Sequence, residues 1–340
     1  MSKRILLTAG NSFVGHHILE DLLKNTDWDI VTIDRLSKST SSGFDRMRDI
    51  NAYDSNRVTH YTFDLNNPIG EGLQKELGQF NYILHVAANS HVDTSIEDPV
   101  PFVMNNVQSA LTMLEYARLQ PALEKFLYFS TDEVYGPAPE GVLYKEGDRY
   151  LPTNPYSASK AAAESICYSY ANTYRVPIVI TNGMNIVGER QHPEKYLPLV
   201  INKVLKDETV YIHSNPEKTQ AGKRHYIHAR NVASAVRFVL TNTDEKLDNN
   251  DASLGKFHIV GEKELDNLQL AQIIADAVGK PLKYEMVDFH SSRPGHDLRY
   301  AMSGDKLKAY GWEPPHTIEA SIKNIVDWTL CEENKHWLDE

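Results

Sequence analysis

Short apolar runs alternate with longer segments of helical periodicity along the first half of the chain. Apolar runs of this length, bounded by helical segments, are typical of strands in a parallel sheet. They predict strands at residues 5–8, 30–34, 59–63, 82–86, 126–130 and 178–181. We therefore expect an α/β fold in which a doubly wound parallel sheet is covered by crossover helices.

The alternation loosens after about residue 185, where short helical and strand-like segments mix. Residues 265–278 and 318–330 have amphipathic patterns that predict packing helices, and the polar residues 214–222 predict a surface loop. We expect a first domain at residues 1–184, which carries the candidate catalytic residues, and a smaller mixed α/β lobe at residues 185–340. Because no Gly/Ser linker separates them, we expect some chain crossings back to the first domain.

Composition and charge exclude several kinds of partner. The 340 residues include 35 Lys and Arg against 46 Asp and Glu, a net charge of -11 that argues against nucleic-acid binding. No apolar run is long enough for a signal peptide or a membrane span, so we expect a cytoplasmic protein without a membrane partner. Cys167 and Cys331 have no metal-site spacing, which predicts two reduced thiols and no metal.

Three polar residues follow the predicted strand at residues 126–130: Thr131, Asp132 and Glu133. In an open α/β sheet they would emerge at the carboxyl edge, where such sheets bind ligands. Adjacent acids are often only a solvated loop pair. Close to other catalytic groups, however, two carboxyls can serve as an acid and a base.

Tyr156 and Lys160 lie four residues apart in a segment of helical composition. On one helix face, the lysine ammonium would lie beside the phenol and lower its pKa, so that the phenol could take a proton from a sugar hydroxyl. An ordinary amphipathic helix is the alternative. Together with the acid pair, the tyrosine and lysine suggest a hydride-transfer enzyme that also removes water.

The first predicted strand leads into the sequence TAGNSFVG at residues 8–15, followed by a helical segment. A strand, a tight glycine turn and a helix N-terminus form a site for a pyrophosphate. Asp34 ends the second strand about twenty residues further on, where a carboxylate accepts ribose hydroxyls and disfavours a 2′-phosphate. This favours NAD over NADP. The neighbouring Arg35 could pair with such a phosphate or be a solvated side chain.

The glycine loop resembles that of the extended short-chain dehydrogenase/reductase family, which implies a Rossmann domain. The family has Gly where this chain has Ala9 and Ser12, while Gly15 is retained, so the loop could be displaced or hold its cofactor more weakly. The resemblance implies a tightly bound NAD that is recycled within the reaction. The implied cofactor-binding residues are Gly10, Ser12, Phe13, Val14, Gly15, Asp34, Asp64, Leu65, Ala87, Ala88, Asn106, Tyr156 and Lys160.

Five motifs in register resemble the nucleotide-sugar 4,6-dehydratases of that family: residues 91–95, 130–136, 156–160, 193–195 and 293–300. The resemblance implies that Tyr156, aided by Thr131 and Lys160, deprotonates the C4 hydroxyl of a hexose during hydride transfer to NAD. Glu133 would then remove the C5 hydrogen and Asp132 would protonate the leaving C6 hydroxyl. Hydride return to C6 would give a 4-keto-6-deoxy sugar from a substrate of the dTDP-glucose or UDP-glucose type.

The same resemblance implies residues that bind the nucleotide-diphosphate sugar: His91, Asn185, Lys195, Arg224, Asn267, Arg293 and His296. Asn89 stands where the family commonly has Glu, and Arg224-His225-Tyr226 replaces an Arg-Asp-aromatic triplet. Because of these departures, the base and the hexose stay open. Family members dimerise through two helices that resemble residues 103–119 and 156–174, which predicts a homodimer.

Two other functions fit parts of the sequence. A nucleotide-sugar 4-epimerase or decarboxylase would share the Tyr156 and Lys160 pair but does not need both Asp132 and Glu133. A non-catalytic dinucleotide-binding regulator would account for Ala9 and Ser12. The intact acid pair favours the dehydratase.

Overall fold

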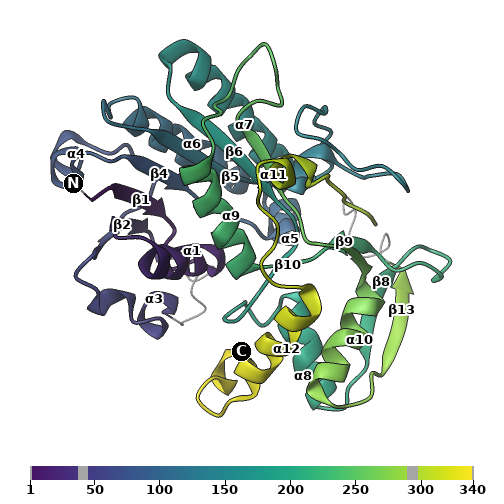
Figure 1. The fold of residues 1–340 in the computed structure, drawn as a ribbon. Helices are drawn as coiled ribbons and strands as arrows, with labels where there is room; N and C mark the ends of the chain where they lie inside the picture. The colour runs from purple at the N-terminus through teal and green to yellow at the C-terminus, as the bar shows by residue number, and fades with distance from the viewer. Residues whose placement is uncertain (1, 37–44, 289–297, 339–340) are drawn as a thin grey trace.

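Seven parallel strands form the centre of the computed structural model, which describes residues 2–36, 45–288 and 298–338 (Figure 1). Their order is β11-β6-β5-β4-β1-β2-β3, with every pair parallel. The order reverses between β1 and β4, the kind of point at which open α/β sheets bind ligands. The strands are β1 (Arg4–Thr8), β2 (Asp29–Asp34), β3 (Val58–Thr62), β4 (Tyr82–His85), β5 (Lys125–Thr131), β6 (Ile178–Gly183) and β11 (Lys256–Ile259).

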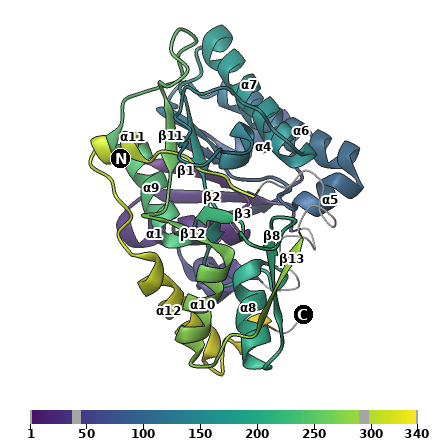
Figure 2. The same ribbon diagram turned by 90° about the vertical axis from the view of Figure 1, so that its right-hand side faces the viewer.

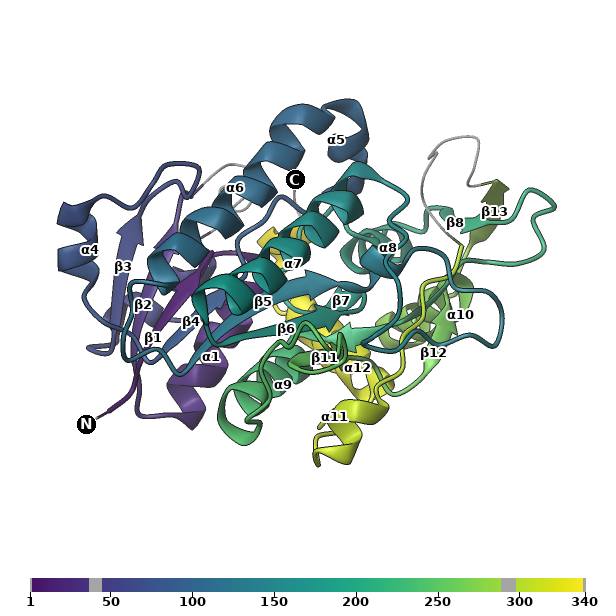
Figure 3. The ribbon, with the colours of Figure 1, turned by 90° about the horizontal axis from the view of Figure 1, so that it is seen from above.

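Helices cover both faces of this sheet, which confirms the predicted fold class (Figure 2). One face packs against α1 (Phe13–Asn25), α9 (Ala229–Asn242) and α11 (Asp305–Ala309). The other packs against α4 (Glu71–Leu77), α6 (Pro99–Ala117) and α7 (Pro155–Tyr174), and Figure 3 shows α6 and α7 side by side. Since the strands are buried on both faces, apolar side chains are favoured on both, which is why the central strands appear in the sequence as apolar runs.

The seventh strand, β11, was not predicted, whereas the six predicted strands are all present. Its sequence is KFHI, so Lys256 and His258 interrupt the apolar run although both are fully buried. These side chains have buried partners, Glu164 for Lys256 and Tyr135 for His258. Together with α9, β11 shows that residues after 185 return to the main sheet. The domain boundary at 184/185 itself stays a prediction.

A separate apolar cluster forms the second lobe from α8 (Tyr196–Leu205), α10 (Asn267–Val278), α12 (Ile318–Leu330), β8 (Val210–Ser214) and β13 (Tyr284–Asp288). The predicted helix at residues 318–330 is confirmed, and the one at residues 265–278 begins at Asn267 because Asp266 caps it. No helix in the described part of the chain has the length and apolarity needed to cross a membrane. The short elements are α3 (Arg46–Asp49), α5 (Val92–Glu97), β7 (Ile186–Val187), β9 (Lys223–His225), β10 (Ile227–His228), β12 (Glu264–Asp266), η1 (Ala52–Asp54), η2 (Asp132–Tyr135) and η3 (Lys335–Leu338).

Candidate active site

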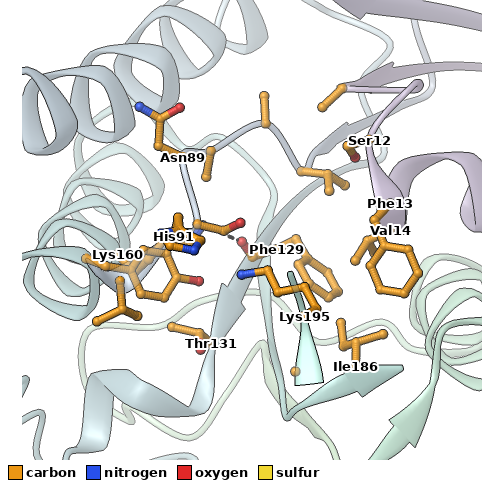
Figure 4. Close-up of a pocket in the computed structure, with 18 of the residues that line it drawn as sticks. Ser12, Phe13, Val14, Asn89, His91, Phe129, Thr131, Lys160, Ile186 and Lys195 are labelled. Atoms are coloured by element: carbon orange, nitrogen blue, oxygen red, sulfur yellow. Dashed lines mark hydrogen bonds between the residues drawn. The ribbon is translucent and has the colours of Figure 1, made fainter. Parts of the chain in front are cut away.

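A cavity of about 480 Å³ lies at the carboxyl edge of the sheet and reaches the second lobe. Figure 4 shows Ser12, Phe13 and Val14 at one end and His91, Thr131 and Lys160 at the other. Predicted site residues that line it are Ser12, Phe13, Val14, Asp34, Asp64, Leu65, Ala87, Ala88, His91, Thr131, Glu133, Tyr156, Lys160, Asn185 and Lys195. Gly10, Gly15, Asn106, Asp132, Arg224 and Asn267 are not among its lining residues. Arg293 and His296 lie outside the described residues.

The glycine loop makes a tight turn into α1. Ser12 is the N-cap of this helix, and its Oγ accepts a hydrogen bond of 3.1 Å from the Gly15 amide. Ala9 has a φ of 56°, a left-handed conformation that favours glycine, and its carbonyl accepts a 3.0 Å hydrogen bond from the Ser12 amide. The turn thus accommodates both residues that depart from the family pattern.

Replacement of Gly15 by Ala should open this turn. A Cβ at Gly15 would lie 2.0 Å from the Ala9 carbonyl oxygen, so the loop backbone must move. We expect a loss of about 1–3 kcal/mol in the free energy of unfolding and at least about tenfold weaker NAD binding. Calorimetric titration and urea denaturation measure both. Gly72→Ala in α4, where a Cβ meets nothing within 4 Å, is the control and should leave NAD binding unchanged.

Asp34 lies at the end of β2 with its carboxylate held by the backbone. Its Oδ2 accepts from the Asn11 amide at 3.1 Å and its Oδ1 from the Leu36 amide at 2.8 Å. These bonds fix an acceptor at the edge of the cavity where a ribose hydroxyl can donate to it. The tight turn, the helix N-terminus and this carboxylate together fit NAD, which would be held by the glycine loop and Asp34.

Arg35 is partly exposed, and its guanidinium bonds to side chains of neighbouring segments. Its guanidinium donates to Asn105 Oδ1 at 2.7 Å and to Asn89 Oδ1 at 2.8 Å, and lies 3.9 Å from Asp64. Asn89, the residue that departs from the family motif, therefore acts as an acceptor for this cation. Through these contacts, Arg35 links the segments that follow β2, β3 and β4.

Asn106 does not line the cavity but hydrogen-bonds to Asn89, which does. Its Oδ1 accepts from the Asn89 amide at 2.7 Å, and its Nδ2 donates to the Asn89 carbonyl and to Ser159 Oγ, each at 2.9 Å. The side chain thereby ties the segment after β4 to α7. Its position is consistent with an indirect role toward a cofactor.

The two adjacent carboxyl groups at the end of β5 lie in different environments. Asp132 is buried, its Oδ1 accepts from Thr131 Oγ1 at 3.0 Å, and no described residue bonds its Oδ2. Burial raises the pKa of Asp132 to about 6, against the opposing charge of Arg224. Glu133 lines the cavity and accepts a 3.0 Å hydrogen bond from Asn154 Nδ2, which favours its charged form. This arrangement suits an acid beside a base.

The raised pKa of Asp132 predicts a pH dependence. Its protonated form is present at low pH and is lost as the pH rises through about 6. If Asp132 is the acid of the elimination, kcat/KM should fall with rising pH through that range, since this ratio reports groups of the free enzyme. We expect Asp132→Asn to retain about 1% or less of the activity and to lose this limb of the profile. If kcat/KM of Asp132→Asn still falls with rising pH through this range, the fall is caused by a group other than Asp132.

Tyr156 and Lys160 both face the cavity from α7, but their expected mutual effect is absent. Lys160 Nζ donates to the Phe129 carbonyl at 2.7 Å, and burial lowers its pKa to about 8. Burial and the nearby Glu133 carboxylate raise the pKa of Tyr156, and a hydrogen bond with Thr131 opposes them. The prediction that the Lys160 ammonium lowers the pKa of the phenol was therefore wrong for this structure, because the ammonium points to the backbone of β5.

The predicted substrate-binding residues lie at different depths. His91 caps α5 through its side chain, and Lys195 occupies the N-cap position of α8 without a side-chain cap bond. Both line the cavity with Asn185. Arg224 donates to the Leu298 carbonyl at 2.7 Å and lies over the Tyr300 ring, and Asn267 Oδ1 accepts from the Tyr226 hydroxyl. The last two side chains are thus bonded outside the lining of the cavity.

Sequence reasoning missed a buried network behind the catalytic helix. Asn182 Nδ2 donates to the Thr131 carbonyl at 3.0 Å and to Glu164 Oε1 at 2.8 Å. Glu164 also accepts from Tyr150 and lies 3.1 Å from Lys256 Nζ. It follows Lys160 by one helical turn, and its charge raises the pKa of Lys160 against the effect of burial. Asn154 was also missed, although an Asn before Pro155 is a helix-start signal.

Known proteins resemble the chain over nearly its whole length. A 34% identical relative, the low-salt glycan biosynthesis protein Agl12 of Haloferax volcanii, aligns with 96% of this chain and 98% of its own. The dTDP-glucose 4,6-dehydratase of Escherichia coli is 31% identical over 99% of this chain and 94% of its own. The crystal structure of dTDP-glucose 4,6-dehydratase from Bacillus anthracis in complex with NAD has a TM-score of 0.83 and 27% identity, covering 99% of this chain and 98% of that one.

The sequence profile described as the NAD dependent epimerase/dehydratase family matches residues 5–255. The matched segment extends from β1 to the start of β11 and includes the glycine loop, Asp34 and the catalytic candidates on β5, η2 and α7. The chain belongs to the NAD dependent epimerase/dehydratase family.

Proposed function

We propose that the protein catalyses the NAD-dependent 4,6-dehydration of a nucleotide-diphosphate hexose of the dTDP-glucose or UDP-glucose type. The observation that carries this proposal is the adjacent pair of a buried, raised-pKa Asp132 and a cavity-lining Glu133 beside Tyr156. An acid and a base next to a phenol suit an oxidation that is followed by loss of water. The names of the dehydratase relatives support the same reaction.

Oxidation at C4 uses Tyr156, Thr131 and Lys160. The glycine loop and Asp34 would hold NAD, which would supply the acceptor and donor of hydride for the reaction. Tyr156 takes the proton of the C4 hydroxyl, and Thr131 hydrogen-bonds the phenol and so opposes the rise in its pKa that burial causes. Lys160 lines the same cavity, where its ammonium would orient the nicotinamide ribose while it donates to the Phe129 carbonyl.

The 4-ketone acidifies the C5 hydrogen, so that elimination becomes possible. Glu133 takes this proton, and the C6–O bond breaks as Asp132 protonates the hydroxyl, which leaves as water. The hydrogen bond between Asp132 and Thr131 connects the buried acid to the cavity wall. A proton returned to C5 completes the 4-keto-6-deoxy sugar.

The nucleotide-diphosphate group would occupy the lobe side of the cavity. Lys195 lines the cavity at the start of α8, and a cation near a helix N-terminus suits a diphosphate. His91 and Asn185 line the same cavity. Direct contacts of Arg224 and Asn267 with the nucleotide, and those of Arg293 and His296, stay predictions.

A 4-epimerase is the rival within the family. It would use Tyr156 and Lys160 in the same way but would not need an acid with a raised pKa next to a base. The environment of Asp132 therefore favours the dehydratase. The regulator alternative is disfavoured because the loop fits its turn with Ala9 and Ser12 in place.

We also propose a cytoplasmic homodimer with a tightly retained NAD. α6 and α7 lie side by side, and α6 exposes Val100 at 70% and Met104 at 59% of their surface (Figure 3). Apolar exposure of this kind on adjacent helices suits a four-helix interface with a second copy. Cys167 and Cys331 are free thiols, which suits a reducing compartment. Met104→Glu should yield monomers in sedimentation measurements.

Mass spectrometry tests the proposed reaction and identifies its substrate. The purified protein is incubated separately with dTDP-glucose, UDP-glucose and UDP-N-acetylglucosamine. We expect loss of one water from one of the first two sugars. An unchanged mass together with formation of the C4 epimer would assign the protein to the rival function.

A further inference from the structure

Asn154 contacts both the candidate base and the helix that carries Tyr156. Asn154 is the N-cap of α7, where its Oδ1 accepts from the Ser157 backbone amide at 2.8 Å. In return, the backbone amide of Asn154 donates to Ser157 Oγ at 3.2 Å. The Nδ2 group of the same side chain donates to Glu133 Oε2 at 3.0 Å. The side chain is buried, with 6% of its surface exposed. One amide thus joins η2 to the first turn of α7.

We propose that Asn154 is a positioning residue for the elimination step, which holds the Glu133 carboxylate at a fixed orientation relative to Tyr156. The inference rests on the proposed function. Oxidation at C4 and proton removal at C5 act on neighbouring carbons, so the phenol and the carboxylate must keep a fixed separation. Asn154 sets that separation because the helix cap fixes its Oδ1 and the base occupies its Nδ2.

The amide is chemically suited to this double contact. An Asn side chain accepts through its oxygen and donates through its nitrogen, whereas Asp at the same place only accepts and Ser is one atom too short to do both. All three are good helix N-caps, so the cap alone does not require Asn. The contact with Glu133 is the feature that distinguishes them.

The donated hydrogen bond also favours the form of Glu133 that the reaction needs. In the elimination the C5–H bond breaks, its proton goes to Glu133, its electron pair forms the C5–C6 double bond, and the C6 hydroxyl leaves as water with the Asp132 proton. Glu133 must therefore begin ionised, and a donor to its Oε2 favours that state. The Tyr156 phenol lies near enough for the Glu133 carboxylate to raise its pKa, and the Glu133 backbone amide donates to Thr131 Oγ1 at 3.4 Å.

Two variants separate positioning from capping. Asn154→Ser keeps a cap but loses the donor, and we expect elimination to slow about tenfold. Asn154→Asp keeps a cap but places a second carboxylate against Glu133, so that the two share a proton, and we expect a fall of at least about a hundredfold. In both variants C4 oxidation continues, so reduced cofactor should accumulate after substrate is added and be visible in the absorbance spectrum.

Ser157→Ala is the matched control, since it removes the reciprocal bond of the cap without touching Glu133. It should show no accumulation of reduced cofactor. NAD binding and the thermal midpoint of each variant show that the fold is kept. Elimination by Asn154→Asp at the wild-type rate, or equal losses in Asn154→Asp and Ser157→Ala, would overturn the inference. A wild-type protein that releases no water from any nucleotide sugar would instead contradict the proposed function on which it rests.

Discussion

Glu133→Gln should slow the elimination of water by about 10²–10⁴-fold, the usual contribution of a general base. The amide is nearly isosteric with the carboxylate and can still accept from Asn154 Nδ2, so the local structure should be kept. It cannot take the C5 proton. Because Tyr156 and Thr131 are unchanged, C4 oxidation should continue, and reduced cofactor should accumulate on a single turnover. Stopped-flow absorbance with mass spectrometry of the released sugar measures the two steps separately.

Glu140→Gln is the control for this experiment. Glu140 lies after η2 on the exposed surface, where its carboxylate pairs with Lys223 at 3.2 Å. Its replacement should leave both steps at the wild-type rate. Near-normal water release by Glu133→Gln would show that Glu133 is not the base. Another group in the cavity would then have to take the C5 proton.

Lys256→Met should lower the free energy of unfolding by about 3–5 kcal/mol, because it leaves the buried Glu164 without its cation. Both side chains are 0% exposed, and their atoms lie 3.1 Å apart. Burial lowers the pKa of Lys256 and the Glu164 carboxylate opposes this effect, so the carboxylate favours the charged form of the buried lysine. Urea denaturation of the wild type and the variant measures the loss.

The double variant Lys256→Met with Glu164→Gln should recover much of that stability. A neutral amide at residue 164 can accept from Asn182 and hydrogen-bond Tyr150, so both side chains keep their bond to residue 164, and Tyr150 loses only the bond from Lys256. Lys323→Met, which breaks an exposed pair with Asp327, is the control and should cost less than about 1 kcal/mol. If Lys256→Met lowers the free energy of unfolding no more than the control does, the buried pair does not stabilise the fold as proposed.

The sequence predicted the fold where burial selects apolar residues on both faces of a strand. That rule located β1, β2, β4, β5 and β6 from composition and length. It failed for β11, because Lys256 and His258 are buried there through polar partners that lie far away in the sequence. Pairing across such distances leaves no local pattern.

The candidate site was predictable in so far as chain order places residues at strand ends. Asp34 and Thr131 are the last residues of β2 and β5, and both line one cavity because the carboxyl ends of parallel strands meet at one edge of the sheet. The direction of a side chain is a different matter. Lys160 donates to the Phe129 carbonyl, and Arg35 to two amides, because of neighbours that only the folded chain supplies. For the same reason the role of Asn154 could not be inferred from its place before Pro155.

The fate of a deuterium at C4 of the substrate distinguishes 4,6-dehydration from epimerisation. The protein is incubated with a nucleotide-diphosphate hexose that carries deuterium at C4, and the product is examined by mass spectrometry and NMR. We expect loss of one water with the deuterium retained at C6 of the same molecule, and a solvent hydrogen at C5. A product of unchanged mass, with deuterium still at C4 and the C4 configuration inverted, would show epimerisation and would contradict the proposed dehydration.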